Sequence, residues 1–405
     1  MQLSDVARLE SGHTPSKRHP EYWGGDVPWI GIRDAKAHHG QIIHETLQTT
    51  NKLGILNSSA RILPEGTVCL SRTASVGYVV TMGRPMATSQ DFANWICSEY
   101  LDRRFLAYLF LAEQDSLLRF ASGAIHQTIY YPELKALHIC LPPLAEQQRV
   151  IAILDDAFAD LANAAANATK NINNAHELFD SYLSSIFLRG GEDWRDLRLR
   201  DVVISINTGP FGSLLHKSDY VSEGIPVINP INIQENSIVP DASKSVTIDA
   251  MRRLWAYQLS TNDIILGRRG EIGRCAVVRK EQAGWLCGTG CFFIKTGDAV
   301  NAEFLAHLLR SVYYSSRLEG VAKGATMKNL SNSALQNLRI VLPPVSEQKL
   351  LGIRFGRIAE ETRRVAEAYK MKLASLDALR KSVLNKAFSG ELTAPPLSAI
   401  KEAAE

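Results

Sequence analysis

The heptapeptide Leu141-Pro-Pro-Leu-Ala-Glu-Gln has a second copy, Leu342-Pro-Pro-Val-Ser-Glu-Gln, about 200 positions later in the chain. A proline pair is excluded from the interior of an α-helix but suits its first turn. After each pair, apolar residues recur at alternating steps of four and three, which is the pattern of a long helix with one apolar seam. Each copy therefore predicts the start of a long helix.

The repeat extends upstream of both heptapeptides. Three pairs of segments match in the same order: Val68-Cys-Leu-Ser-Arg-Thr-Ala-Ser-Val-Gly with Ile264-Ile-Leu-Gly-Arg-Arg-Gly-Glu-Ile-Gly, Phe105-Leu-Ala-Tyr-Leu with Phe304-Leu-Ala-His-Leu, and Leu3-Ser-Asp-Val with Leu199-Arg-Asp-Val. Because order and spacing are kept, the sequence predicts two diverged halves.

Each half begins with short β-branched runs punctuated by Gly, Pro and Asn, and contains one helical segment near Phe105 or Phe304. Strands are predicted at Val68–Leu70, Val79–Thr81, Ile264–Leu266, Cys275–Val278 and Cys291–Ile294. We therefore predict an α+β fold in which two tandem α/β domains are separated by two long helices. The predicted boundaries are residues 1–143, 144–190, 195–344 and 345–390, followed by a flexible tail at 391–405.

The apolar seams suggest how the two helices are used. Each seam alone would leave a long apolar stripe in water. We therefore expect the helices to pair as an antiparallel coiled coil, giving the chain a pseudo-two-fold internal repeat. The alternative is two separate amphipathic helices, each lying on its own domain.

Composition bounds the function without deciding it. The chain has 405 residues, 45% of them apolar, and a net charge of +3, which suits a folded protein but is less basic than most nucleic-acid binders. We expect no membrane span and no signal peptide, and hence a cytoplasmic protein. The cysteines mostly lie in apolar runs and are predicted to be reduced core residues: Cys69, Cys97, Cys140, Cys275, Cys287 and Cys291.

Catalytic motifs are missing from the sequence. There is no G-x-x-x-x-G-K-[ST] phosphate loop, and both proline pairs follow leucine rather than the Asn or Asp of an amino-methyltransferase motif. Cys287 and Cys291 have no second Cys/His pair nearby, so we expect no metal site. His38, His39 and His126 lack a partner nucleophile. We therefore predict that the chain is not an enzyme.

Two related domains on a fixed spacer suit a ligand with two sites at fixed separation, and duplex DNA is such a ligand. Arg72 and Arg268 occupy equivalent positions directly after a strand, and Arg, Lys, Asn and Gln are the side chains that read base edges. Plain solvated turns are the alternative. The DNA-binding candidates are Arg72, Ser75, His126, Gln127, Lys217, Arg268, Arg269, Arg274, Lys323 and Lys328.

In these features the chain resembles the specificity subunit of type I restriction-modification systems. The resemblance rests on the Arg72 and Arg268 loops, both Leu-Pro-Pro…Glu-Gln segments, and three further stretches: Gly12-His-Thr-Pro-Ser, Glu21-Tyr-Trp-Gly-Gly-Asp-Val-Pro-Trp-Ile and Lys386-Ala-Phe-Ser-Gly-Glu-Leu. It covers essentially the whole chain.

The resemblance implies two target recognition domains, each reading one part of a bipartite, interrupted double-stranded DNA site. It also implies that the helices dock two methyltransferase subunits, and that two restriction-translocase subunits complete the complex. The assembled complex would be an adenine-specific DNA methyltransferase and a site-specific deoxyribonuclease. S-adenosylmethionine, ATP and Mg²⁺ would bind the partner subunits and not this chain. Docking and coiled-coil candidates are Glu146, Gln147, Leu154, Leu161, Glu347, Gln348, Ile358, Val365 and Leu376.

Three alternatives stay open on sequence alone. The partner could be a fused methyltransferase-nuclease of a related system. The chain could instead be a coiled-coil scaffold whose end domains bind proteins, in which case DNA affinity and its salt dependence would be missing. As an outright DNA methyltransferase, the isolated chain would bind S-adenosylmethionine.

Overall fold

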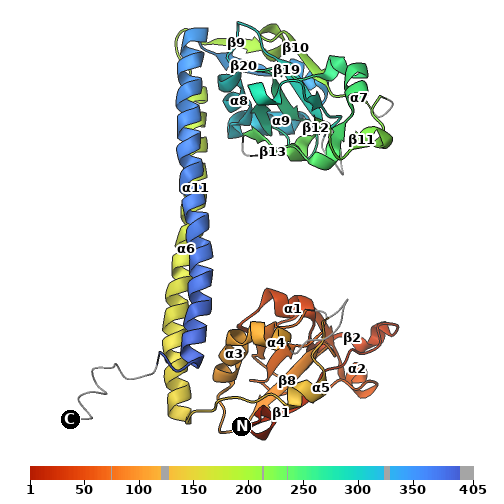
Figure 1. Ribbon diagram of the computed structural model, residues 1–405, viewed down its shortest axis with the longest axis vertical. Helices are drawn as coiled ribbons and strands as arrows, with labels where there is room; N and C mark the ends of the chain where they lie inside the picture. The colour runs from red at the N-terminus through yellow and green to blue at the C-terminus, as the bar shows by residue number, and fades with distance from the viewer. Residues whose placement is uncertain (74, 120–126, 212–213, 235, 323–328, 393–405) are drawn as a thin grey trace, which may run out of the picture. The chain divides into compact units, whose positions relative to one another are not determined.

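A computed structural model describes residues 1–73, 75–119, 127–211, 214–234, 236–322 and 329–392. The chain divides into two compact units (Figure 1). Unit 1 comprises residues 1–168 and 371–405, and unit 2 comprises residues 169–370. In the described part of the chain, no helix is long and apolar enough to cross a membrane.

Unit 1 is built on a five-stranded sheet with the order β1-β8-β5-β6-β3, beside a three-stranded sheet with the order β4-β2-β7. The pairs β1–β8, β8–β5 and β5–β6 are antiparallel, whereas β3 and β7 pair in parallel with β6 and β2. The strands are β1 (Ala7–Ser11), β2 (Trp23–Ile30), β3 (Gln41–Ile43), β4 (Gln48–Thr50), β5 (Val68–Ser71), β6 (Val79–Met82), β7 (Ala87–Thr88) and β8 (Phe92–Cys97).

The larger sheet of unit 1 is buried on both faces. Val68 and Leu70 of β5 pack into the core on the helix side, while Cys69 between them packs into a second core on the opposite face. This double burial explains why the strand is a continuous apolar run rather than an alternating one. The helices of the unit outside the long pair are α1 (Ile32–Ala37), α2 (Lys52–Leu56), α3 (Arg103–Ala112), α4 (Gln114–Arg119) and α5 (Tyr131–Lys135).

Unit 2 repeats this plan with a four-stranded antiparallel sheet of order β10-β19-β16-β17. Smaller sheets have the orders β11-β15-β12-β18, β13-β14 and β20-β9. The strands are β9 (Arg195–Arg198), β10 (Ser205–Thr208), β11 (Tyr220–Val221), β12 (Ile225–Ile228), β13 (Ile233–Gln234), β14 (Ser237–Ile238), β15 (Ser245–Val246), β16 (Ile264–Gly267), β17 (Cys275–Val277), β18 (Leu286–Cys287), β19 (Cys291–Lys295) and β20 (Arg339–Leu342).

The two units share the order of four strands in the main sheet and one parallel strand pair. The order β1-β8-β5-β6 corresponds to β10-β19-β16-β17, and the parallel pair β2–β7 corresponds to β12–β18. Outside the long pair, the α-helices of unit 2 follow the order of α2 to α5: α7 (Ile248–Arg253), α8 (Ala302–Arg310), α9 (Val312–Val321) and α10 (Asn332–Gln336). A short 3-10 helix, Pro230–Asn232, stands after β12 where unit 1 has α1 after β2. The predicted strands and the helical segments near Phe105 and Phe304 are confirmed, and so is the internal repeat.

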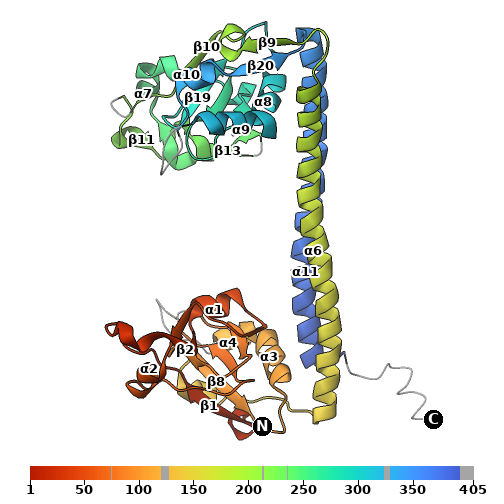
Figure 2. The same ribbon diagram turned by 180° about the vertical axis from the view of Figure 1, so that it is seen from behind.

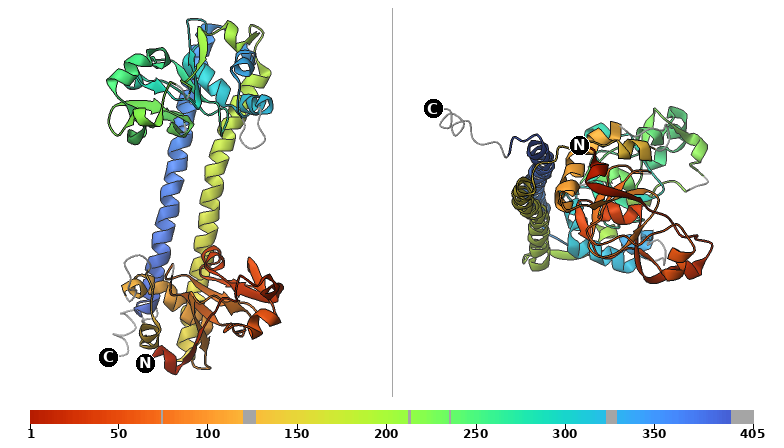
Figure 3. Two further views of the ribbon diagram at one scale, coloured as in Figure 1. Left: turned by 90° about the vertical axis from the view of Figure 1, so that its right-hand side faces the viewer. Right: turned by 90° about the horizontal axis from the view of Figure 1, so that it is seen from below.

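Two long helices, α6 (Leu144–Arg189) and α11 (Val345–Phe388), each begin directly after a proline pair, as predicted. They lie side by side within each unit (Figures 1 and 2), and Figure 3 shows them from a further direction. In unit 1, Leu154 near the start of α6 shares a core with Leu384 near the end of α11. In unit 2, Phe187 near the end of α6 makes an edge-to-face contact with Phe355 near the start of α11. The pairing is therefore antiparallel, and the alternative of two separate helices is wrong.

The cysteines are free thiols, but only Cys69, Cys275, Cys287 and Cys291 are core residues. Cys97, at the end of β8, is half-buried. Cys140 is exposed because the segment before the first proline pair lies at the surface. The predicted tail at 391–405 lies outside the described residues from position 393 onward.

Candidate nucleic-acid interface

In unit 1, the turn between β7 and β8 forms hydrogen bonds to the segments that follow three other strands, β1, β2 and β5. Ser89 N donates to Ile30 O at 3.0 Å, which fixes the end of β2, and Arg72 N donates to Asp91 O at 2.8 Å, which fixes the end of β5. Thr14 Oγ1, just after β1, donates to Gln90 Oε1 at 2.5 Å. Strands far apart in sequence thus deliver their following residues to one place.

A fifth segment arrives from the region before α5. Ile129 N donates to Arg72 O at 2.8 Å, and the hydroxyls of Thr73 and Thr128 lie 2.8 Å apart. We call the assembled residues loop cluster 1: 12–14, 31–33, 72–73, 89–91 and 127–129.

Unit 2 builds the same arrangement around the turn Gly288–Gly290. Gly288 N donates to Ile228 O at 2.7 Å, and Arg268 N donates to Gly290 O at 3.0 Å. Thr289 Oγ1 donates to Pro210 O at 2.6 Å. The segment before α10 joins them, because Leu330 N donates to Arg268 O at 2.9 Å. Loop cluster 2 comprises residues 209–211, 229–231, 268–269, 288–290 and 329–330.

The glycines of this turn are required by close approach. A Cβ on Gly288 would lie 2.4 Å from Asn229 Oδ1, and a Cβ on Gly290 would lie 2.7 Å from Pro230 Cδ. Any side chain at either position would push the 229–231 loop away from the cluster. Gly288-Thr-Gly290 is therefore a tight turn whose glycines are needed for close packing against the 229–231 loop.

The matched arginines hold these clusters together. Arg72 stacks on Tyr131 with its guanidinium carbon 4.8 Å from the ring centroid, and its Nη1 donates to Ile129 O at 3.4 Å. Arg268 stacks on Phe292 at 5.2 Å, and its Nε donates to Asn329 Oδ1 at 3.2 Å. Each arginine therefore ties the arriving segment to the sheet.

Arg268 and Arg269 differ in access to solvent. Arg268 is only 9% exposed, whereas Arg269 is exposed and pairs through its backbone with Asn329. Burial, and then the adjacent charge of Arg269, lower the pKa of Arg268. Of the two neighbouring guanidinium groups, only that of Arg269 is open to solvent, because Arg268 is engaged with Phe292 and Asn329.

The remaining predicted residues are placed unevenly. Ser75 follows Arg72 but is half-buried, and its carbonyl accepts a hydrogen bond from Ser71 Oγ at 2.5 Å. Gln127 is exposed in cluster 1. Arg274 forms an ion pair with Glu271, which compensates part of its charge. Lys217 is exposed in a short turn, and no described contact joins it to cluster 2. His126, Lys323 and Lys328 lie outside the described residues.

The sequence interpretation missed several residues of the clusters. Exposed or half-exposed side chains from other loops stand beside the arginines: Thr14, Arg33 and Gln90 in cluster 1, and Phe211, Ile231 and Thr289 in cluster 2. Each lies a few residues from a matched strand end. Their positions in the repeat could have indicated them, but only the strand order shows that they meet.

The glutamines of the repeated heptapeptide have a structural role. Gln147 Oε1 accepts from Asp102 N at 2.8 Å, and its Nε2 donates to Tyr100 O and Pro142 O, both at 2.9 Å. Gln348 makes the equivalent bonds in unit 2, to Asn301 N and Pro343 O, both at 2.8 Å. Because both side chains are buried and fully bonded within the chain, their assignment as partner-docking residues is corrected: they clamp the long helices to the units.

The other helix candidates fall into two groups. Leu154 is buried, and Leu161, Ile358 and Leu376 are half-buried, as expected along a seam. Val365 is 42% exposed, whereas its neighbour Ala366 is 3% exposed. The apolar seam of α11 therefore passes through Ala366 and not through the predicted Val365. The spacing from Thr362 to the next seam residue is four positions instead of three.

The glutamates of the heptapeptides lie at the helix starts. Glu146 pairs with Arg149 at 3.7 Å, and Glu347 accepts from Trp194 Nε1 at 3.3 Å. Both are half-buried, and their docking role stays a prediction.

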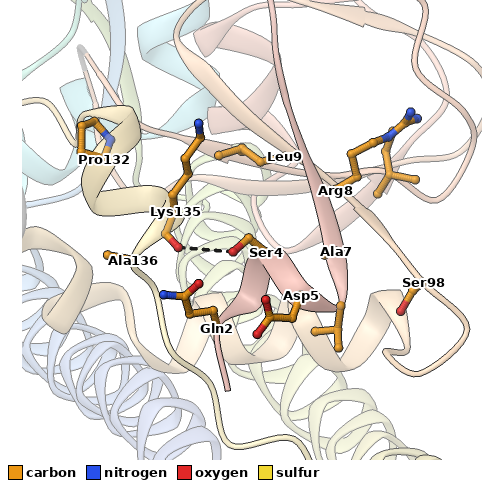
Figure 4. Close-up of a pocket in the computed structure, with 12 residues that line it drawn as sticks. Gln2, Ser4, Asp5, Ala7, Arg8, Leu9, Ser98, Pro132, Lys135 and Ala136 are labelled. Carbon is orange, nitrogen blue, oxygen red and sulfur yellow. Dashed lines mark hydrogen bonds between the residues drawn. The ribbon is translucent and has the colours of Figure 1, made fainter.

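Figure 4 shows a hollow of unit 1 at the start of β1, separate from loop cluster 1. Ser4 Oγ donates to Lys135 O across it at 3.5 Å. Its lining contains one carboxylate, Asp5, and neither histidine nor cysteine. In the described residues, no group of three His, Cys, Asp or Glu side chains could hold a metal ion.

Comparison with known proteins identifies the repeat. The family model "Type I restriction modification DNA specificity domain" matches residues 1–171 and 191–362. The MjaIX type I restriction enzyme specificity subunit of Methanocaldococcus jannaschii is 23% identical over 96% of this chain and 92% of its own length. The EcoprrI specificity subunit of Escherichia coli is 19% identical over 92% and 90%.

Solved structures share the fold. A chain from a study of complex assembly and conformational transition of the type I R-M system matches with a TM-score of 0.73 and 18% identity, over 96% of this chain and 97% of that one. The HsdS subunit from Thermoanaerobacter tengcongensis matches with a TM-score of 0.53 and 18% identity, over 96% of each chain.

Proposed function

The chain belongs to the type I restriction modification DNA specificity domain family, and we propose that it reads a bipartite double-stranded DNA site, one part with each unit. Members of this family recognise DNA sequence and are not themselves catalysts. We propose further that the two loop clusters read the two parts of the site and that partner subunits bind the long helices.

One observation carries the proposal: the same five loops are gathered twice, in loop clusters 1 and 2, on equivalent strands of two units. Loops held rigidly by backbone hydrogen bonds can present side chains into a major groove without losing much conformational freedom on binding. The backbone of the clusters agrees, while the exposed side chains differ. A chain whose two domains recognise different DNA sequences needs a shared backbone framework and different exposed side chains.

The long helices are the proposed docking surface for two methyltransferase subunits. α6 and α11 bury one face against each other and leave large apolar side chains exposed elsewhere: Leu178, Leu188, Leu350 and Ile353 in unit 2. Such side chains are typical anchors of a protein interface. Two restriction-translocase subunits would complete the complex, and S-adenosylmethionine, ATP and Mg²⁺ would bind these partners.

Selection of bound duplexes from a random DNA pool tests the proposal, using the chain in complex with its co-encoded methyltransferase. We expect two short constant blocks separated by a constant gap, and an affinity that falls steeply as salt is raised. A single continuous block would mean that one unit reads sequence alone. No enrichment at low salt with an intact complex would refute DNA reading and favour a scaffold.

A further inference from the structure

The two loop clusters present opposite chemistry at equivalent backbone positions. Gly12 and Gly209 occupy the same place, each so close to its central turn that a Cβ would lie 2.0 Å from a turn carbonyl oxygen. Two residues later, cluster 1 has Thr14 and cluster 2 has Phe211. Phe211 is 59% exposed. A hydrogen-bonding side chain in one unit is thus replaced by an aromatic ring in the other.

A second pair of positions shows the same change. Asn229 N donates to Asn232 Oδ1 at 2.9 Å, just as Gly31 N donates to Asp34 Oδ2 at 2.9 Å, so the positions in the loops after β12 and β2 correspond one by one. Two residues into this loop, unit 1 has the exposed Arg33 and unit 2 has Ile231, which is 74% exposed.

Both apolar residues of unit 2 are held by a fixed backbone. The residue before each is a proline that lies against the central turn: Pro210 O accepts from Thr289 Oγ1 at 2.6 Å, and Pro230 packs against Gly290. Phe211 and Ile231 therefore lack the favourable free energy that apolar side chains gain when they are transferred out of water. The Gly288–Gly290 turn that holds both prolines also accepts a hydrogen bond from Arg268 N, so these loops and the Arg268–Arg269 segment belong to one cluster.

We propose that Phe211 and Ile231 contact thymine methyl groups in the major groove, so that unit 2 reads a part of the DNA site that contains thymine. The inference rests on the proposed function and deepens it. The C5-methyl of thymine is the apolar group that base pairs expose in the major groove, and aromatic and aliphatic side chains are its partners in direct readout. In unit 1, Thr14, Arg33 and Gln90 offer hydrogen-bonding groups instead, and read base edges by donors and acceptors.

Replacement of thymine by uracil tests this inference at the level of single atoms, because uracil lacks only the methyl group. Starting from the selected duplex, each thymine is replaced in turn and affinity is measured with the chain–methyltransferase complex. We expect a loss of about fourfold for each contacted methyl group, from the transfer free energy of one buried carbon. The loss should be confined to the half of the site whose base preference Arg269→Ala relaxes.

Variants locate the contact. In Phe211→Ala and Ile231→Ala, thymine and uracil duplexes should bind equally at the position that the missing side chain contacts. Ile248→Ala is the matched control: Ile248 is also exposed, at the start of α7 in unit 2, but outside loop cluster 2, so the uracil effect should persist. Thr14→Ala in unit 1 should leave it unchanged too.

The outcomes separate the two proposals. Without a selected two-block site, the proposed function fails. With such a site, the thymine inference is overturned if the unit 2 half contains no thymine, if uracil binds as well as thymine throughout it, or if both alanine variants keep the full uracil effect.

Discussion

Replacement of Gln348 by alanine should loosen the start of α11 from unit 2. The Gln348 side chain is buried and bridges two segments: its Oε1 accepts from Asn301 N at 2.8 Å, and its Nε2 donates to Pro343 O at 2.8 Å. Asn301 in turn caps α8, accepting from Phe304 N at 3.0 Å. One amide thus fixes the proline pair, the cap of α8 and the start of the long helix together.

The magnitude follows from the groups that lose their partners. In Gln348→Ala, a backbone N–H and a backbone carbonyl are left unpaired in a buried site, and each costs about 1–3 kcal/mol. We expect the free energy of unfolding of unit 2 to fall by about 3 kcal/mol, after partial compensation by water. Local opening of the first turn of α8 should become roughly 100-fold more frequent, since about 1.4 kcal/mol corresponds to a factor of ten.

Urea unfolding combined with hydrogen–deuterium exchange measures both quantities. Faster exchange is expected in peptides covering residues 299–306 and 343–352, while peptides of unit 1 stay unchanged. Lys349→Ala is the control, because Lys349 is the exposed next residue on the same helix. Gln147→Ala should speed exchange and lower the free energy of unfolding in unit 1 instead, because Gln147 makes the equivalent hydrogen bonds there. A loss below about 0.5 kcal/mol for Gln348→Ala, which is the usual range of a surface substitution, would refute the clamp.

Three further outcomes are expected. Burial, followed by the charges of Arg310 and Arg279, lowers the pKa of His307 to about 2, so between that value and about 6.5 the unfolded chain binds a proton that the folded chain does not. Stability should therefore fall as pH drops below about 6.5, by up to about 1.4 kcal/mol per pH unit, and urea titrations of His307→Asn should lack this component. Arg269→Ala should relax base preference in one half of the selected DNA site, and equal loss in both halves would contradict its place in cluster 2. Ala366→Glu should cost about 2–3 kcal/mol in chemical denaturation whereas Val365→Glu stays within about 0.5 kcal/mol, and the reverse order would put Val365 in the seam.

The periodic parts of the fold could be read from the sequence because they depend on local rules. Proline pairs fix where α6 and α11 begin, and the four-and-three spacing fixes which face is apolar. The same spacing could not choose between Val365 and Ala366, because alanine and valine are both acceptable at a seam. The burial of Ala366 within the folded chain, where it is 3% exposed, decided that choice.

The candidate site was predicted in part, for a similar reason. Arg72 and Arg268 were found because they recur at the same place in the repeat, yet their side chains stack on Tyr131 and Phe292 and tie segments together. The exposed residues of the same loop clusters, such as Ile231, carry no motif. A common residue type such as isoleucine becomes a candidate site residue at this position only because of the loops that surround it.

The sequence by itself determined that the chain is a duplicated α+β unit with two long helices, since repeats, proline pairs and apolar periodicity are local or strictly ordered along the chain. Tertiary structure alone decided which loops meet, because the strand order β1-β8-β5-β6 brings together the ends of strands separated by dozens of residues. It also decided that Gln147 and Gln348 are buried clamps, since a side chain becomes a structural bond or a surface for partners according to what packs over it.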